Sequence, residues 1–239
     1  MGCVLIHGFP GAPEEMRWLG QHLAQNGITA LGVRLFGLGT QPADAIRARK
    51  EQWIANVEDG LALLTGTCQR IFLVGFSMGG VLALNLGSRT HVAGIVAMAT
   101  PAALPPLANR LRPILKPLSL VWRYRRPSEP SDWRDKQAEA LNLHYDVQPV
   151  RAIVELHDLV EETRQVLPKV QAPTLLIYSR NDASVPPRNA EQIYARLGSV
   201  QKELVWVQQS GHSLPRDAQR ETVFSHITEF VNEGRGASS

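Results

Sequence analysis

The chain is poor in cysteine, in aromatic residues and in net charge. It contains 2 cysteines and 6% aromatic residues among 239, and its formal net charge at pH 7 is only +3. Two cysteines are too few for a disulfide scaffold, and because Cys3 and Cys68 lie in or beside apolar segments we expect reduced core thiols. No apolar run approaches the roughly 18 residues that a membrane-spanning helix requires, so no transmembrane segment is predicted.

The amino-terminal segment lacks the features of a secretion signal. The chain enters a strand-like run at Cys3–Ile6 without a basic stretch or a cleavage site. We therefore expect a cytoplasmic protein. The basic excess is local, because residues 101–136 contain eight Lys or Arg and three Asp or Glu, a surplus of +5. No nucleic-acid recognition motif accompanies this cluster, so we expect no nucleic-acid partner and at most a weak interfacial contact with anionic membranes.

What the chain does contain is a regular alternation of apolar strands and amphipathic helices. Most strand-like runs are apolar throughout, as expected for strands covered by helices on both faces. This alternation predicts an α/β fold, a three-layer α/β/α sandwich with a mostly parallel sheet. The expected strands are Cys3–Ile6, Ile28–Val33, Ile71–Val74, Val92–Met98, Thr174–Tyr178 and Glu203–Val207, and the expected helices cover residues 14–25, 50–65, 78–88, 187–197 and 217–233.

One segment interrupts the alternation. No convincing strand lies between Thr100 and Pro173, and residues 101–130 contain seven prolines. Residues 133–145 and 149–167 are expected to be helices. An insertion of this size is best interpreted as a cap over the carboxyl edge of the sheet, where open α/β sheets place their sites. The alternative is a helical pair packed on the flank of the sheet.

The predicted domain organisation follows from this insertion. We expect a core of residues 1–100 and 171–234, a cap or lid of residues 101–170, and a disordered tail of residues 235–239. Apolar side chains in the cap would suit an acyl chain. They are Leu104, Leu107, Leu111, Ile114, Leu115, Leu118, Leu120, Val121 and Trp122.

The most informative motif is Gly75-Phe76-Ser77-Met78-Gly79, which directly follows the apolar run Ile71–Val74 and precedes an amphipathic run. A serine between a strand and a helix lies on a sharp turn that exposes its hydroxyl group, and the flanking glycines avoid clashes in that turn. The pattern indicates the nucleophile elbow of a serine hydrolase, with Ser77 as the nucleophile. The alternative is a plain glycine-rich turn after a core strand.

A serine nucleophile needs a base and an acid, and in this architecture they follow it in the order acid, then histidine. Asp182 lies in a loop after the strand Thr174–Tyr178, and His212 lies in a loop after the strand Glu203–Val207. Asp182 is therefore the predicted catalytic acid, and His212 is the predicted base. Asp158, on a presumed cap helix, is the nearest rival for the acid, and the other histidines fall on helices or before a strand.

The glycine-rich turn His7-Gly8-Phe9-Pro10-Gly11 ends the first strand. Its N–H groups can point toward a carbonyl oxygen bound over Ser77, and the N–H of Met78 adds a donor at the start of a helix. Phe9 and Met78 are therefore the predicted oxyanion hole. We expect His7 to brace the loop rather than to take part in chemistry.

With these residues placed, the chain resembles the α/β-hydrolases, and it is most similar to the small bacterial carboxylesterase and monoacylglycerol lipase group. The resemblance covers nearly the whole chain and is weakest in the cap. It implies a Ser77–His212–Asp182 triad, a lid over an acyl pocket, and no metal or organic cofactor. Members of the group usually have further strands before the His-Gly strand, so the sheet is expected to lack its N-terminal edge strands. Gly37-Leu38-Gly39 stands where many members have Gly-His-Gly.

The leading hypothesis is hydrolysis of a small-molecule carboxylic ester with an apolar acyl chain, such as a monoacylglycerol. The same triad also serves thioesterases, carbon–carbon hydrolases and acyltransferases, and these alternatives stay open. A non-catalytic binding protein with a hydrolase fold is a further alternative, because a fold alone does not determine function. Oligomeric state and chain-length preference are not determined by the sequence.

Overall fold

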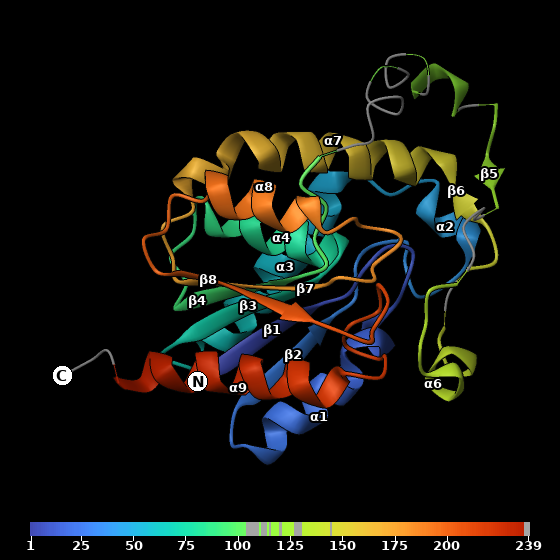
Figure 1. Ribbon diagram of the computed structural model, residues 1–239. Coiled ribbons are helices and arrows are strands. Elements are labelled where there is room, and N and C mark those ends of the chain that lie inside the picture. Colours follow the sequence, from blue (N-terminus) through green and yellow to red (C-terminus); the bar gives the residue numbers. More distant parts are fainter. Residues whose placement is uncertain are drawn as a thin grey trace.

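The computed structural model describes residues 1–103, 110, 114, 116–119, 121–126, 131–143 and 145–236. Within these residues the main sheet has six strands in the order β2-β1-β3-β4-β7-β8, and all neighbouring strands are parallel (Figure 1). Each strand lies within about two residues of its predicted bounds. The strands are β1 (Gly2–Ile6), β2 (Thr29–Val33), β3 (Ile71–Phe76), β4 (Gly94–Met98), β7 (Thr174–Ser179) and β8 (Lys202–Val207).

Helices cover both faces of the sheet (Figure 1). One face is covered by α1 (Arg17–Gln25) and α9 (Arg220–Gly236), and the other by α3 (Lys50–Thr65), α4 (Met78–Gly87) and α8 (Arg188–Arg196). Each face buries its own apolar cluster, and the central strands β1, β3 and β4 are buried along their whole length. Burial on both faces explains why these strands are apolar throughout. The predicted three-layer α/β fold is confirmed.

The second half of the inserted segment, residues 150–166, does not lie over the edge of the sheet as a cap would. Helix α7 (Val150–Val166) packs along α4, and the Asn85 amide contacts the Thr163 hydroxyl at 3.2 Å. All ten residues of α4 are buried, so this helix needs cover on its outer side as well as from the sheet. Helix α7 supplies that cover, which is the flank packing that the sequence left as the alternative.

The other described elements of the inserted segment lie beyond the carboxyl edge of the sheet (Figure 1). It contains a short antiparallel pair, β5 (Tyr124–Arg125) with β6 (Gln148–Pro149), and the helix α6 (Lys136–Ala140), which is shorter than the predicted 133–145 helix. Of the apolar cap residues, Ile114, Leu118, Val121 and Trp122 are exposed. The others lie outside the described residues; they are Leu104, Leu107, Leu111, Leu115 and Leu120.

The structure also contains the short helical turns η1 (Pro13–Met16), α2 (Pro42–Ala45) and η2 (Leu167–Lys169). Helix α9 continues to Gly236, and residues 237–239 lie outside the described residues, so the disordered tail stays a prediction. Both cysteines are buried and free, as predicted. In the part of the chain that the structure describes, no helix combines the length and apolarity needed to cross a bilayer.

The strand order locates the site. The chain passes from β1 outward to β2 and then returns to β3 on the other side of β1, so the order reverses there. The carboxyl ends of β1 and β3 are neighbours, with Ile6 paired to Gly75. Ligands of open α/β sheets bind at such a switch point, outside the carboxyl ends of the strands. The loops that begin at His7 and Ser77 therefore meet where a site is expected.

Candidate active site

Ser77 lies on the sharp turn between β3 and α4. Its backbone has φ 53° and ψ −115°, a combination that residues other than glycine rarely adopt. The Ser77 N–H donates to the carbonyl of Met98 at the end of β4 (2.8 Å), which holds the turn against the neighbouring strand. This is the strained strand-to-helix turn that the motif predicts.

The turn is tight enough to exclude side chains two positions before and two positions after Ser77, at Gly75 and Gly79. A Cβ atom on Gly75 would overlap the carbonyl of Gly79, and a Cβ atom on Gly79 would overlap the carbonyl of Ile6. Both conflicts are with backbone atoms, which cannot rotate away as a side chain can. The two glycines therefore allow α4 to begin directly against β1 and β3.

Gly79→Ala is expected to lower the free energy of unfolding by about 2–3 kcal/mol, because the Ile6 carbonyl must move to admit the methyl group. Urea unfolding of the wild type and the variant measures the difference. Gly66→Ala is the matched control, since a Cβ atom there would meet the Leu63 carbonyl at 3.6 Å, an ordinary contact. Its effect should stay below about 1 kcal/mol. Equal effects in the two variants would contradict the steric explanation.

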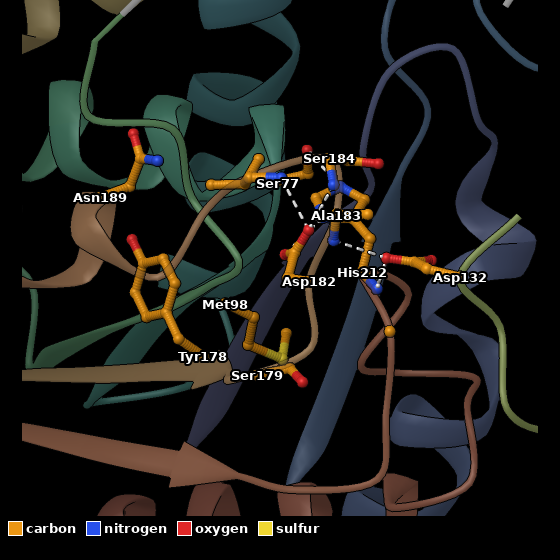
Figure 2. A network of polar contacts seen from close by, with 12 residues as sticks. Ser77, Met98, Asp132, Tyr178, Ser179, Asp182, Ala183, Ser184, Asn189 and His212 are labelled. Carbon is orange, nitrogen blue, oxygen red and sulfur yellow. Dashed lines mark hydrogen bonds and ion pairs between the residues drawn. The ribbon is translucent and has the colours of Figure 1, made fainter. Parts of the chain in front are cut away.

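His212 lies between Ser77 and Asp182 and contacts both. Its Nε2 atom lies 3.1 Å from the Ser77 hydroxyl oxygen, and its Nδ1 atom lies 2.8 Å from Asp182 Oδ2. The three residues come from loops that follow β3, β7 and β8, and they meet at the carboxyl edge of the sheet (Figure 2). The fold thus brings together the three residues that were selected from the sequence for a catalytic triad.

The carboxylate of Asp182 is held in one orientation by its own loop. Its side chain is fully buried, and Oδ1 accepts the N–H groups of Ser184 (2.9 Å) and Val185 (2.7 Å). With Oδ1 engaged in this way, Oδ2 faces His212. The rival carboxylate Asp158 lies on α7, 3.9 Å from the Lys116 ammonium group, and so belongs to a different contact.

The electrostatic environment of His212 favours its protonated form. Burial of the ring lowers the pKa of His212, but the neighbouring carboxylates outweigh this effect and leave that pKa above its ordinary value. Asp182 makes the largest opposing contribution, through its charge and its hydrogen bond, and the charges of Asp132 and Glu15 add to it. Stabilisation of the imidazolium is what a general base requires when it takes a proton.

The loop after β1 passes directly beside Ser77. A Cβ atom on Gly8 would lie 3.3 Å from the Ser77 Cβ atom, so the approach is close. Beneath it, His7 is fully buried, accepts the Leu35 N–H at Nε2 (3.3 Å) and donates from Nδ1 to the Gly8 carbonyl (2.8 Å). Burial lowers the pKa of His7 to about 4, so the ring is neutral. His7 therefore braces the loop, as expected.

Glu15, on η1, places another carboxylate at the site. It accepts the Gly8 N–H at 2.9 Å, and a Cβ atom on Gly11 would overlap its carboxyl group. Burial raises the pKa of Glu15 to about 7, although the Gly8 hydrogen bond and the charges of His212 and Arg216 act in the opposite direction. Glu15 therefore changes its charge near neutral pH.

This ionisation has a consequence for stability. The ordinary pKa of the carboxyl group is 4.5, which describes the unfolded chain, whereas in the folded protein it is about 7. Between these values the unfolded state binds fewer protons, so the free energy of unfolding falls as pH rises, by at most about 3 kcal/mol. Glutamine keeps the shape of Glu15 without its charge. As pH rises from 4.5 to 8, the free energy of unfolding should therefore fall less in Glu15→Gln than in the wild type.

Urea unfolding at these two pH values measures the effect. Glu58→Gln is the control, because Glu58 forms an exposed ion pair with Arg89 (3.0 Å) and should contribute less than about 0.5 kcal/mol at either pH. Its stability should follow the wild type. If the free energy of unfolding of Glu15→Gln changes with pH as it does in the wild type, burial of the ionised Glu15 carboxylate does not cause the change.

Two further carboxylates at the site were not identified from the sequence. Asp132 Oδ2 accepts the N–H groups of His212 and Ala183, both at 2.9 Å. Asp217 is fully buried and accepts the N–H of Gly211 at 2.6 Å. Neither lies in a recognisable motif. The one available signal was that Asp132 is among the few acidic residues of the basic 101–136 segment.

An open hollow of about 340 Å³ lies at the opposite edge of the sheet. Its lining includes Arg70, Ala93, Thr174 and Lys202, which precede or begin β3, β4, β7 and β8. The length of the sheet separates it from Ser77, so it is not the pocket for a group that Ser77 attacks. Across the described ranges of the chain, no cluster of three or more His, Cys, Asp or Glu side chains is placed to hold a metal ion.

The fold and the site together define the class of protein. A parallel sheet flanked by helices, with a serine on a strained strand-to-helix turn and a histidine and an aspartate on later loops, is the architecture of the α/β-hydrolases. Residues 2–219 match the model of the hydrolase family described as "Serine aminopeptidase, S33", and the chain belongs to this family.

Relatives within this class are named as lipases and esterases. The chain is 32% identical over 237 residues to the thermostable monoacylglycerol lipase of Bacillus sp. (strain H-257), covering 99% of this chain and 92% of that protein. It is 28% identical over 231 residues to the carboxylesterase of Bacillus subtilis (strain 168), covering 96% and 92%. A solved structure of the metagenome-derived lipolytic enzymes LipS and LipT superposes with a TM-score of 0.85 at 30% identity, covering 97% and 93%. The resemblance inferred from the motifs is confirmed.

Proposed function

We propose that this protein is a carboxylic ester hydrolase in which Ser77 is the nucleophile, His212 the general base and Asp182 the acid that orients the base. The observation that carries the proposal is the continuous series of contacts from Ser77 Oγ to His212 Nε2 (3.1 Å) and from His212 Nδ1 to Asp182 Oδ2 (2.8 Å). The names of the two bacterial relatives, a monoacylglycerol lipase and a carboxylesterase, support an ester as substrate.

The reaction follows from the roles of these three groups. Asp182 accepts the Nδ1–H of His212, which leaves Nε2 with a lone pair directed at the Ser77 hydroxyl group. Ser77 attacks the ester carbonyl as His212 takes its proton, and His212 then gives that proton to the departing alcohol. Water repeats these steps on the acyl-enzyme, releases the carboxylic acid and restores Ser77.

The negative charge on the tetrahedral intermediate needs hydrogen-bond donors, and we assign the N–H groups of Phe9 and Met78 to this role. Met78 is the first residue of α4, where an N–H has no partner within the helix and the helix dipole favours an anion. Phe9 follows Gly8 on the loop that packs against Ser77. Within the described part of the chain, neither N–H donates to a protein acceptor, so both are available to a substrate oxygen.

The proposed substrates are esters with an apolar acyl chain, including monoacylglycerols. The support is the relatives' names and the apolar composition of the 101–130 segment. A cytoplasmic location and a weak contact with lipid interfaces stay predictions from the sequence. Thioesters, carbon–carbon substrates and acyl transfer are the alternatives for the same three residues, and the experiment below separates them.

Initial hydrolysis rates across p-nitrophenyl esters from acetate to palmitate test the proposal, with a monoacylglycerol assayed alongside and Ser77→Ala as the control. A Ser77-dependent rate with a preference along the chain-length series is the expected result. Turnover of the monoacylglycerol would identify a lipase, whereas turnover limited to short esters would identify a carboxylesterase. No turnover of any ester, with Ser77 still labelled by a fluorophosphonate, would overturn the ester proposal in favour of the alternatives.

A further inference from the structure

Asp132 connects two of the loops that carry the proposed catalytic residues. Its Oδ2 atom accepts the N–H of His212 at 2.9 Å and the N–H of Ala183, the residue after Asp182, also at 2.9 Å (Figure 2). A single carboxylate oxygen therefore joins the loop of the base to the loop of the acid. The carboxylate comes from the inserted segment before α6, more than 45 residues from either loop.

The segment that carries Asp132 is itself fixed to the core. Asp217 is fully buried, and its Oδ1 accepts the N–H groups of Arg134 (2.9 Å) and Asp135 (2.7 Å). The other oxygen of Asp217 accepts the N–H of Gly211 at 2.6 Å, next to His212. The inserted segment and the His212 loop thus exchange hydrogen bonds in both directions, through one carboxylate on each side. Hydrogen bonds to ionised acceptors are stronger than neutral ones, so this arrangement restrains both partners.

The charge of Asp132 also acts on His212. Burial lowers the pKa of His212, Asp182 raises it most, and the charges of Asp132 and Glu15 raise it further. These carboxylates approach the ring from three elements: the loop after β7, the segment before α6, and η1. The positive charge of Arg216 acts on Glu15 and lowers the pKa of its carboxyl group.

We propose that Asp132 is a positioning residue for the reaction, which sets the distance between the acid and base loops and places a carboxylate beside His212. The inference rests on the proposed function of His212 as the general base. Asp132 does not touch the reacting atoms, because its contacts are to backbone N–H groups. It therefore acts through His212 and Asp182 rather than on the substrate.

Two variants separate the two parts of this role. Asp132→Asn keeps an oxygen that can accept the same N–H groups but removes the charge, so the acid limb of the kcat profile should move to lower pH. Asp132→Ala removes both, so kcat should fall about 10- to 100-fold, since small displacements of catalytic groups have effects of this size. KM should stay within about 3-fold, because substrate contacts are intact.

Asp135→Asn is the matched control. It removes a carboxylate from the same segment, but that carboxylate pairs with Arg220 (2.7 Å) and caps α6 through the N–H groups of Gln137 and Ala138. Its kcat and pH profile should match the wild type within about 2-fold, because asparagine is also a good helix cap. Circular dichroism and thermal unfolding confirm that each variant is folded at the assay temperature.

An unchanged kcat in Asp132→Ala, or an acid limb that stays in place in Asp132→Asn, would overturn the inference. The inference would also be overturned if the Asp132 variants lost no more kcat than Asp135→Asn does. To separate this test from that of the ester proposal, His212 is also titrated by NMR and Ser77 is labelled with a fluorophosphonate. If the wild type hydrolyses no ester but the Asp132 variants still change the His212 titration and slow the labelling, the ester proposal fails and the inference stands.

Discussion

Ser77→Ala is expected to lower kcat/KM for ester hydrolysis by about 10⁵-fold or more, because no other group on the elbow can form the acyl-enzyme. The hydroxyl oxygen lies 3.1 Å from His212 Nε2, and its loss leaves the base without a nucleophile to activate. The substitution removes one atom from a side chain on a strained backbone, so the variant should fold normally. Rates with a p-nitrophenyl ester, together with fluorophosphonate labelling, measure the loss.

The matched control is Ser225→Ala. Ser225 lies on α9, and its hydroxyl donates to the Glu221 carbonyl at 3.0 Å, so it can be removed without disturbing the site. This variant should retain wild-type hydrolysis and labelling. Residual hydrolysis by Ser77→Ala above about 1% of the wild-type rate, with purity established by mass spectrometry, would show that another nucleophile carries the reaction.

The positions of the strands and of the three main site residues were predictable from the sequence because the signals are local. An apolar run that ends in Gly-x-Ser-x-Gly specifies a buried strand, a tight turn and a helix within a few residues. The order of Ser77, Asp182 and His212, each after a strand, is also readable, because parallel strands place their carboxyl ends at one edge of the sheet.

The supporting carboxylates were not predictable because they act through contacts between distant segments. Asp132 contacts a residue 80 positions away, and although Glu15 lies only seven residues after Gly8, its contact depends on how the loop folds back over η1. Nothing in the composition around these residues distinguishes them from solvated acids. The packing partner of helix α7 was not predictable for the same reason. Its apolar stripe indicates that one face is covered, but it does not indicate which surface covers that face.

Asp182→Asn is the second substitution with a large expected effect, a loss of about 10⁴-fold in kcat. The structure gives a specific reason. Asp182 Oδ1 accepts two backbone N–H groups, from Ser184 and Val185, so in the variant this position must hold the amide oxygen. The amide NH₂ group then faces His212 Nδ1 at the place where the carboxylate oxygen Oδ2 lies 2.8 Å away.

A ring that faces an NH₂ donor must present Nδ1 as an acceptor, and the neutral imidazole then carries its hydrogen on Nε2. That hydrogen points at the Ser77 hydroxyl oxygen, 3.1 Å away, and His212 can no longer accept the serine proton. The variant should therefore bind ester with little change in KM while kcat and the rate of fluorophosphonate labelling both fall. Nitrogen-15 chemical shifts of the His212 ring report the change of tautomer directly.

Asp182→Asn and Asp132→Asn together identify which carboxylate orients the base. Both remove one negative charge near His212, and both charges favour its imidazolium form. Only Asp182 contacts a ring nitrogen, whereas Asp132 contacts the backbone N–H of the same residue. The tautomer change and the loss of about 10⁴-fold should therefore appear in Asp182→Asn alone. If Asp182→Asn retains more than about a tenth of the wild-type rate, the acid lies elsewhere, and Glu15, whose charge also acts on His212, becomes the first candidate.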